Sequence, residues 1–259
     1  MDDDRRSEFG RFLRTRREQL DPRILGSRDL GRRRTPGLRR EEVAELAGIG
    51  VDWYTRLEQG RDVSPSDATI DALAGALRLT EVEHAHLRAL VHSTPRGPFR
   101  REVVSETIRR LVDQFAHPAY VTGRRFDLLA WNAPAAALFA GFGRAGEADV
   151  NILEYVLTDP GASRLFGATW VDECRRMVGQ FRAIHDLWAG DPAFAELVAR
   201  LARGNPRFVE WWDAHDVRSV GSGRKVLDHP DRGPLQFDYA TFQANEDPAL
   251  KLAIYVPVE

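Results

Sequence analysis

Thirteen arginines lie between residues 5 and 40, where the acidic residues are only Glu8, Glu18, Asp21 and Asp29, so this segment carries a local charge of +9. The whole chain has a net charge of -2 at pH 7, so the excess is local. Guanidinium groups bind phosphates bidentately, and each contact with a nucleic acid releases condensed counterions. The run therefore predicts phosphate contacts, with a merely solvated surface as the alternative.

Residues 38–60, LRREEVAELAGIGVDWYTRLEQG, have the spacing of two short helices joined by a tight turn. The first helix is expected over 38–47, with Val43, Leu46 and Ala47 facing inward, and Gly48 ends it. The second is expected over 51–59. Three residues separate them, which is the geometry of a helix-turn-helix.

The second of these helices should place Tyr54 and Leu57 inward, and its first turns would then enter the major groove of DNA. Its outward residues and the nearby arginines are the candidate DNA contacts: Arg32, Arg33, Arg34, Arg39, Arg40, Val51, Asp52, Trp53, Thr55 and Arg56. For Asp52 two roles stay open, because its carboxylate can accept from a cytosine amino group or cap its own helix.

The elements around this motif predict two domains. Residues 1–95 read as five helices, the first over 6–20 with Phe9, Phe12 and Leu13 on one face. A turn-rich segment over 93–98 then separates this all-α domain from a domain over 96–259.

The second domain is predicted to be α+β with one antiparallel sheet, because about five strands bracket a helical middle. The expected helices span 101–115, 133–140, 170–188, 192–202 and 207–214. The expected strands span 120–122, 127–131, 225–229, 235–242 and 252–258.

The first domain resembles the Cro-like, or xenobiotic-response-element type, helix-turn-helix family over about residues 6–92, including the exit pattern LEQGRDVSPS and LAGALRL. Arg39 and Arg40 stand where typical members have Thr or Ser followed by Gln. Gly50 stands where they have Ser, which makes it a weaker cap.

Nearly the whole chain is similar to the MmyB-like actinobacterial regulators, through RRRTPGLRREEVAELAG, AYVTGRRFDLLAWNAPAAALF, LTDP and FVEWWDAHDVRSVGSGRKVLDHPDRGPLQFDY. That resemblance implies a PAS-like ligand-binding domain and a ligand of the fatty-acid type. Val150-Asn151 replaces the usual Arg-Asn, so nothing that depends on that arginine carries over to this chain.

A PAS-like sheet covered by helices commonly encloses an apolar pocket, and the second domain is rich in aromatic residues. For each aromatic taken alone, plain core is the stronger interpretation. The candidate ligand contacts are Tyr120, Phe126, Trp131, Asn132, Phe139, Phe166 and Trp188. Arg124, Arg125 or Tyr239 would lie near a ligand carboxylate.

Catalytic and metal-binding patterns are weak. The GSG at 221–223 lacks the context of a nucleophile elbow, and His185, His215 and His229 have no zinc-site spacing. Cys174, the single cysteine, is expected to be a buried apolar residue. We therefore expect no enzyme, no cofactor and no metal. Only Lys225 and Lys251 among the 37 basic residues are lysines, a bias that we attribute to a GC-rich genome.

The sequence thus predicts a transcription regulator that binds double-stranded DNA as a homodimer, since one recognition helix covers one half-site. No apolar run is long enough for a membrane span and the charged N-terminal segment is no signal peptide, so we expect a cytoplasmic protein. Two alternatives remain: a second domain that only dimerises or binds a protein, and an enzyme fused to a DNA anchor.

Overall fold

The computed structural model describes residues 2–25, 37–92, 97–142, 150–218 and 221–258. The chain forms two compact units. The first comprises Met1–Gly97 with two later segments, His185–Asp191 and Ala214–Val217, and the second comprises Pro98–Ile184, Pro192–Asp213 and Arg218–Glu259. The division expected at 95/96 does not include these two segments, which belong to the first unit although they come from the middle of the second predicted domain.

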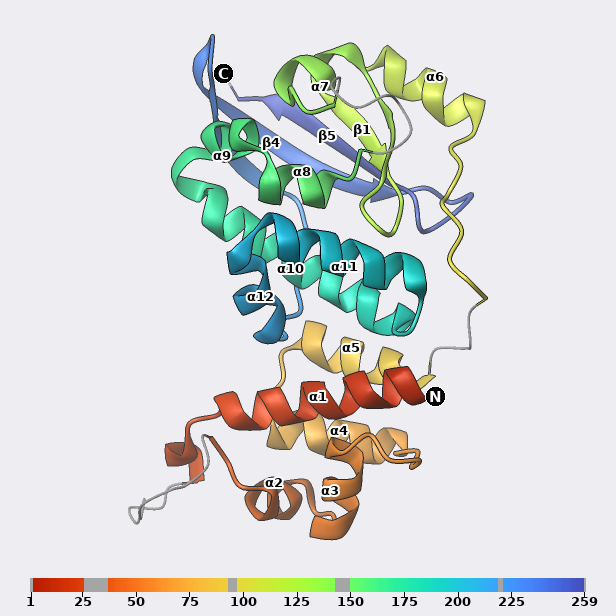
Figure 1. Ribbon diagram of the computed structural model, residues 1–259, viewed down its shortest axis with the longest axis vertical. Coiled ribbons are helices and arrows are strands. Elements are labelled where there is room, and N and C mark those ends of the chain that lie inside the picture. The colour runs from red at the N-terminus through yellow and green to blue at the C-terminus, as the bar shows by residue number, and fades with distance from the viewer. Residues whose placement is uncertain (1, 26–36, 93–96, 143–149, 219–220, 259) are drawn as a thin grey trace. The chain divides into compact units, whose positions relative to one another are not determined.

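The first unit is all helical, as expected. Its helices are α1 (Asp3–Gln19), α2 (Arg40–Ala47), α3 (Val51–Glu58), α4 (Asp67–Ala76) and α5 (Glu81–His92), with short 3-10 turns at Pro22–Leu25 and Asp186–Trp188 (Figure 1). Asp2 caps α1 by accepting from the Arg5 N–H, and Ser66 caps α4 by accepting from the Thr69 N–H.

The core of this unit forms where α1 packs on α3 and α5. Phe9, Phe12 and Leu13 of α1 are fully buried. Gly10 allows the close approach of α1 to the end of α3, because a Cβ atom there would lie 2.6 Å from the Glu58 carbonyl oxygen. The apolar face of α1 therefore packs this helix against α3 and α5, so that α1 supports the helix-turn-helix.

The second unit contains seven helices among its described residues, and two of them, α8 and α9, were not expected from the sequence. The helices are α6 (Glu106–Gln114), α7 (Ala133–Leu138), α8 (Ile152–Thr158), α9 (Pro160–Phe166), α10 (Trp170–His185), α11 (Pro192–Gly204) and α12 (Pro206–Asp213). Helices α8 and α9 are too short for a periodic pattern, but Asn151 and Asp159 cap them with their side chains.

Five antiparallel strands form one sheet in the order β2-β1-β5-β4-β3. They are β1 (Ala119–Thr122), β2 (Leu128–Trp131), β3 (Gly223–His229), β4 (Gly233–Gln243) and β5 (Lys251–Pro257). The α+β architecture expected from the sequence is therefore correct, and the last strand lies at the centre of the sheet beside the first (Figure 1).

The two faces of the sheet have different coverings. Helix α6 packs on β1 and β2, where Val112 joins a cluster with Ala119 and Val121. Because side chains alternate along a strand, Tyr120 and Thr122 of β1 point to the opposite face. That opposite face carries the cavity described below. Among the described residues, no helix is both long enough and apolar enough to cross a membrane.

Candidate functional sites

The helix-turn-helix has the expected geometry. Helix α2 ends at Gly48, which adopts the left-handed conformation (φ 64°, ψ 32°), and α3 begins three residues later. Ala44 and Val43 are fully buried at the junction. Leu46 was expected to face inward, but this residue is 48% exposed, at the edge of the face that buries Val43 and Ala47.

Helix α3 divides into the two faces predicted for a recognition helix. Tyr54 and Leu57 are buried, whereas Val51, Asp52 and Arg56 are exposed. The side chains of Trp53 and Thr55 are partly exposed. Within the part of the chain that the structure describes, the Arg56 guanidinium has no ion pair, so its donors are available to a ligand.

Asp52 does not cap α3. Gly50 occupies the N-cap position without a side-chain hydrogen bond, and Asp52 follows within the first helical turn. No hydrogen bond of the Asp52 carboxylate is found among the described residues. The capping alternative therefore has no support, and a base contact stays a prediction.

A buried carboxylate, Glu58, ties the end of α3 to α1 and to the start of α2. Arg17 donates to Glu58 through Nε (2.7 Å) and Nη2 (3.1 Å), and also to the Leu38 carbonyl. Arg40 donates to Glu58 Oε1 through Nε (2.9 Å) and Nη2 (2.7 Å). Burial alone would raise the pKa of Glu58, but hydrogen bonds from the two arginines outweigh it and keep this pKa below its ordinary value.

Arg40 therefore has a structural partner that the sequence did not reveal, and a phosphate contact by Arg40 stays a prediction. Arg39 differs, because its side chain is exposed and has no ion pair within the described residues. The backbone of Arg39 is engaged instead: its N–H donates to Glu42 Oε2 at 2.6 Å, and its carbonyl accepts from the Val43 N–H at 3.2 Å. Arg32, Arg33 and Arg34 lie outside the described residues.

Fewer guanidinium groups of the arginine run over residues 5–40 are available for phosphates than its local charge indicated. Of its arginines that the structure describes, all but Arg39 have a carboxylate within ion-pair distance, several of them on α1 itself. Exposed pairs of this kind are weak and can exchange a carboxylate for a phosphate. Charge counting along the sequence therefore overestimated the number of uncommitted guanidinium groups.

The second unit contains a cavity between the sheet and its helices. Its aromatic wall includes Tyr120, Phe139, Phe142 and Tyr255. The centroids of the Tyr120 and Phe139 rings lie 5.0–6.0 Å from those of the other rings in this group. About 70 Å³ inside it is open to the centres of water-sized molecules. That is room for about five waters, at roughly 10–15 Å³ for each.

A cluster of three charged residues forms the polar wall of this cavity. Glu173 accepts from Lys225 Nζ at 2.5 Å and from Arg176 Nη2 at 2.5 Å and Nε at 3.0 Å. Burial would raise the pKa of Glu173, but Lys225 and Arg176 outweigh this effect and hold the pKa low. Lys225 also lies 4.5 Å from the Tyr239 ring centroid. Both cations are therefore already committed to a carboxylate.

Lys251 lines the same cavity without such a partner. Its ammonium lies 5.9 Å from the Phe126 ring centroid, and within the described part of the chain no carboxylate pairs with it. Burial lowers the pKa of this ammonium. Both lysines of the chain thus line one cavity, a role that we did not predict although their rarity in an arginine-rich sequence was visible.

Four of the seven predicted ligand contacts lie together in the lining, namely Tyr120, Phe126, Phe139 and Phe166. The other three do not line the cavity. Trp131 stands behind the lining residue Phe142, with ring centroids 6.4 Å apart. Trp188 belongs to the first unit.

Asn132, the third of these, has a structural role. Its side-chain oxygen accepts from the backbone N–H groups of Ala119 and Ala135, and its amide donates to the carbonyls of Phe115 and His117. With these bonds Asn132 caps α7 and ties it to β1. All of its side-chain hydrogen-bonding capacity is thus used within the fold.

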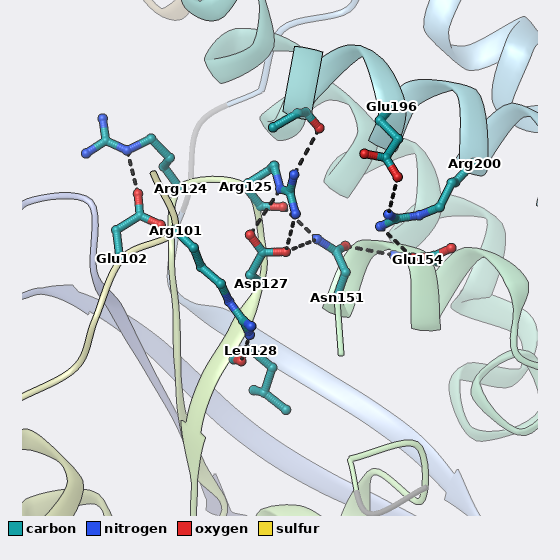
Figure 2. Close-up of polar contacts among 11 residues, drawn as sticks. Arg101, Glu102, Arg124, Arg125, Asp127, Leu128, Asn151, Glu154, Glu196 and Arg200 are labelled. Atoms are coloured by element: carbon teal, nitrogen blue, oxygen red, sulfur yellow. Dashed lines mark hydrogen bonds and ion pairs between the residues drawn. The ribbon is translucent and has the colours of Figure 1, made fainter. Parts of the chain in front are cut away.

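Arg124 and Arg125 were expected near a ligand carboxylate, but each is bound to a protein carboxylate instead (Figure 2). Arg124 pairs with Glu102 at 2.6 Å. Arg125 pairs with Asp127 at 3.0 Å and donates to the Ala193 carbonyl at 2.9 Å. Tyr239, the third candidate, does line the cavity.

The Arg125 network holds Phe126 in a strained conformation. Phe126 has φ 67°, which is uncommon for a residue other than glycine. Asn151 donates to both the Arg125 carbonyl (2.8 Å) and Asp127 Oδ1 (3.2 Å), so the residues on either side of Phe126 are fixed (Figure 2). The Ile152 N–H donates to the Phe126 carbonyl at 2.9 Å. This network directs the Phe126 ring into the cavity, next to Lys251.

Cys174 is buried, and burial raises the pKa of its thiol to about 12. Among the described residues no group of three or more His, Cys, Asp or Glu side chains could hold a metal ion. The cavity lining therefore combines cations, one carboxylate from Glu173, tyrosines and apolar rings.

Two family models match the chain. Residues 104–259 match the MmyB-like transcription regulator ligand binding domain, and residues 8–87 match a helix-turn-helix domain. Comparison with curated proteins gave no match. The two matched segments contain the cavity and the two-faced helix α3, respectively.

Proposed function

Because the chain belongs to the MmyB-like transcription regulators, we propose that it binds DNA sequence-specifically through α3 and senses an apolar small molecule of the fatty-acid type through the cavity. The observation that carries this proposal is the pairing of an exposed recognition face with an aromatic cavity in one chain. Because its target is DNA, we place the protein in the cytoplasm. No catalytic step is assigned to it.

For DNA, we propose that Thr55 and Arg56 contact base edges, with Val51, Asp52 and Trp53 beside them at the start of α3. Arg39, whose guanidinium is uncommitted among the described residues, is proposed to contact a backbone phosphate. Phosphate contacts set the register on the duplex, whereas base contacts select the sequence. A selected set of duplexes, measured at several salt concentrations, separates the two kinds of contact.

For the ligand, we propose that Tyr120, Phe126, Phe139 and Phe166 contact its apolar part. The cavity has room for about five waters, so we expect lining side chains to move when a fatty acid enters. Met177 is suited to this, because it lines the cavity and its unbranched chain adapts easily. Ligand binding should therefore change the packing of α10, which carries Met177.

The test uses the full chain with saturated fatty acids below their micelle concentrations. Binding should raise the melting temperature, by a stabilisation of about 2.7 kcal/mol at a hundredfold excess over the Kd. For regulation, the affinity for operator DNA must also change. A ligand that binds the DNA-competent and the incompetent states equally well does not shift the equilibrium between them. If a panel of fatty acids and other apolar metabolites changes neither quantity, the sensor proposal fails.

The alternative, that the second unit serves as a dimerisation module, rests on one observation. The sheet face opposite the cavity exposes Val226 (43%), Phe242 (55%) and Val256 (46%) on three adjacent strands. We propose a second copy of the chain as its occupant, because a helix-turn-helix needs two copies to read two half-sites. Sedimentation equilibrium of the wild type and of Phe242→Ser tests this. A wild type that is monomeric on and off DNA would refute it.

A further inference from the structure

Two cationic sites line the cavity, and among the described residues only one of them contains a carboxylate. Lys225 and Arg176 share the Glu173 carboxylate at hydrogen-bond distance. Lys251, by contrast, has no carboxylate partner in the described part of the chain. A partly buried ammonium without a counterion is costly, and an anion that enters the cavity would offset this cost.

The surroundings of Lys251 form a site that could accept an anionic group. Thr122 of β1 and Gln243 of β4 lie directly opposite Lys251 in the sheet register. Directly paired residues share a face, so the Thr122 hydroxyl is the neighbouring hydrogen-bond donor on the cavity side, whereas the Gln243 amide donates to the Pro248 carbonyl at 3.3 Å and does not line the cavity. Thr122 lines the cavity as well. The Phe126 ring also lies near Lys251, and Arg125 and Asp127 on either side of Phe126 are both bonded to Asn151.

The aromatic wall gives the cavity a direction. Along β5, Lys251 precedes Ala253 and Tyr255 on the same face, and Tyr255 packs against Tyr120 and Phe139. The uncompensated cation is therefore at one end of this strand and the aromatic rings are towards the other. A ligand with an acidic head and an apolar body matches both ends.

We propose that Lys251 binds the carboxylate of an amphipathic ligand, with the apolar body of that ligand against Tyr120, Phe139 and Tyr255. This inference rests on the proposed sensor function and adds the residue that binds the carboxylate and the orientation of the ligand. We assign the carboxylate to Lys251 rather than to the Glu173–Arg176–Lys225 cluster of the side wall, because each cation of the cluster already donates to Glu173, although the cluster keeps a net charge of +1.

The experiment compares decanoate with decan-1-ol, which has a similar chain and an uncharged head. Calorimetric titration is carried out on the full-length wild type, Lys251→Met and Lys251→Arg. Arg110→Met serves as a control that removes one cation from the same unit, since the Arg110 side chain is 72% exposed on α6. A hydrogen bond to a charged group is worth about tenfold or more in affinity.

The wild type, Lys251→Arg and Arg110→Met should bind decanoate about tenfold more tightly than decan-1-ol. In Lys251→Met the two ligands should bind equally. Equal binding of the two ligands by the wild type would overturn the role of Lys251 but leave the apolar sensor intact. Binding of neither would overturn the proposed function itself.

A second measurement follows ligand binding in the wild type itself and uses a variant only to assign one signal. Reductive methylation with ¹³C labels lysines, and this chain has only two, so the spectrum has few signals. Decanoate should shift the Lys251 signal, assigned by its absence in Lys251→Arg, much more than decan-1-ol does. If decanoate shifts Lys225 instead, the carboxylate binds at the side wall and the proposal is wrong.

Discussion

Glu58→Gln should destabilise the first unit strongly, although glutamine has nearly the same shape. The Glu58 side chain is 1% exposed and that of Arg17 is 5% exposed, so the substitution leaves a buried guanidinium facing a neutral amide. Four charge-assisted hydrogen bonds lose their anionic acceptor, two from Arg17 and two from Arg40. Removing one partner of a buried ion pair costs about 3–5 kcal/mol.

We take about 3 kcal/mol as the expected loss, because the glutamine carbonyl still accepts hydrogen bonds. Urea titration of the full chain, followed by helical circular dichroism and by DNA binding, measures it. The matched control is Arg40→Met, which removes a side chain that is 40% exposed and leaves the Arg17–Glu58 pair intact. That variant should lose about 1 kcal/mol or less.

Two results would refute this reasoning. The first is a loss below about 1 kcal/mol for Glu58→Gln, which would mean that the pair contributes little net free energy. The second is an equal loss for Arg40→Met, which would place the stabilisation in the exposed pair. Either result would also remove the explanation of how the end of α3 is held against α1.

The other predictions concern acid, DNA, the cavity and the turn. The pKa of Glu58 is lower in the folded than in the unfolded state, so its stabilisation is present above the unfolded-state pKa and is lost as the pH falls below about 4. In acid titrations Glu58→Gln should therefore lose less stability than the wild type does. Arg56→Ala should relax the sequence preference at one base pair by about 1–3 kcal/mol in binding assays. Arg39→Ala should instead weaken binding to all duplexes alike, and the slope of log affinity against log salt concentration should become shallower by about 0.9. An unchanged slope would exclude a phosphate contact by Arg39. Trp131→Ala should lower the free energy of unfolding by up to about 3 kcal/mol. The variant should keep the ligand-induced rise in melting temperature, because Trp131 lies behind the lining residue Phe142. Loss of that rise would show that Trp131 contacts the ligand. Gly48→Ala should cost about 1–2 kcal/mol on denaturation through its positive φ alone, because a Cβ there meets no atom within 4 Å, and no loss would mean that the turn relaxes.

The sequence by itself determined the features that depend on local patterns. The faces of α3 follow from helical periodicity, so Tyr54 and Leu57 could be placed inside and Arg56 outside without a structure. Gly48 could be recognised as the turn residue because a left-handed conformation favours glycine. The strand pattern and the turn residues between strands likewise indicated one antiparallel sheet.

Only the tertiary structure decided which charges are free. Glu58 lies 41 residues from Arg17 and 18 from Arg40, so nothing local in the sequence indicates that they meet. The same is true of Glu173 and Lys225, 52 residues apart. Ion pairs between distant segments depend on how the chain is packed, and charge counting along the sequence cannot detect them.

The cavity shows the same division. Four aromatic lining residues could be predicted from the aromatic content of this domain, but only Tyr120 lies on a strand, where the alternation of side chains fixes its face. Lys251 could not, since its position depends on β5 pairing with both β1 and β4, which puts the end of the chain at the centre of the sheet. The sequence therefore determined that an apolar site exists, and the strand order decided which cation faces it.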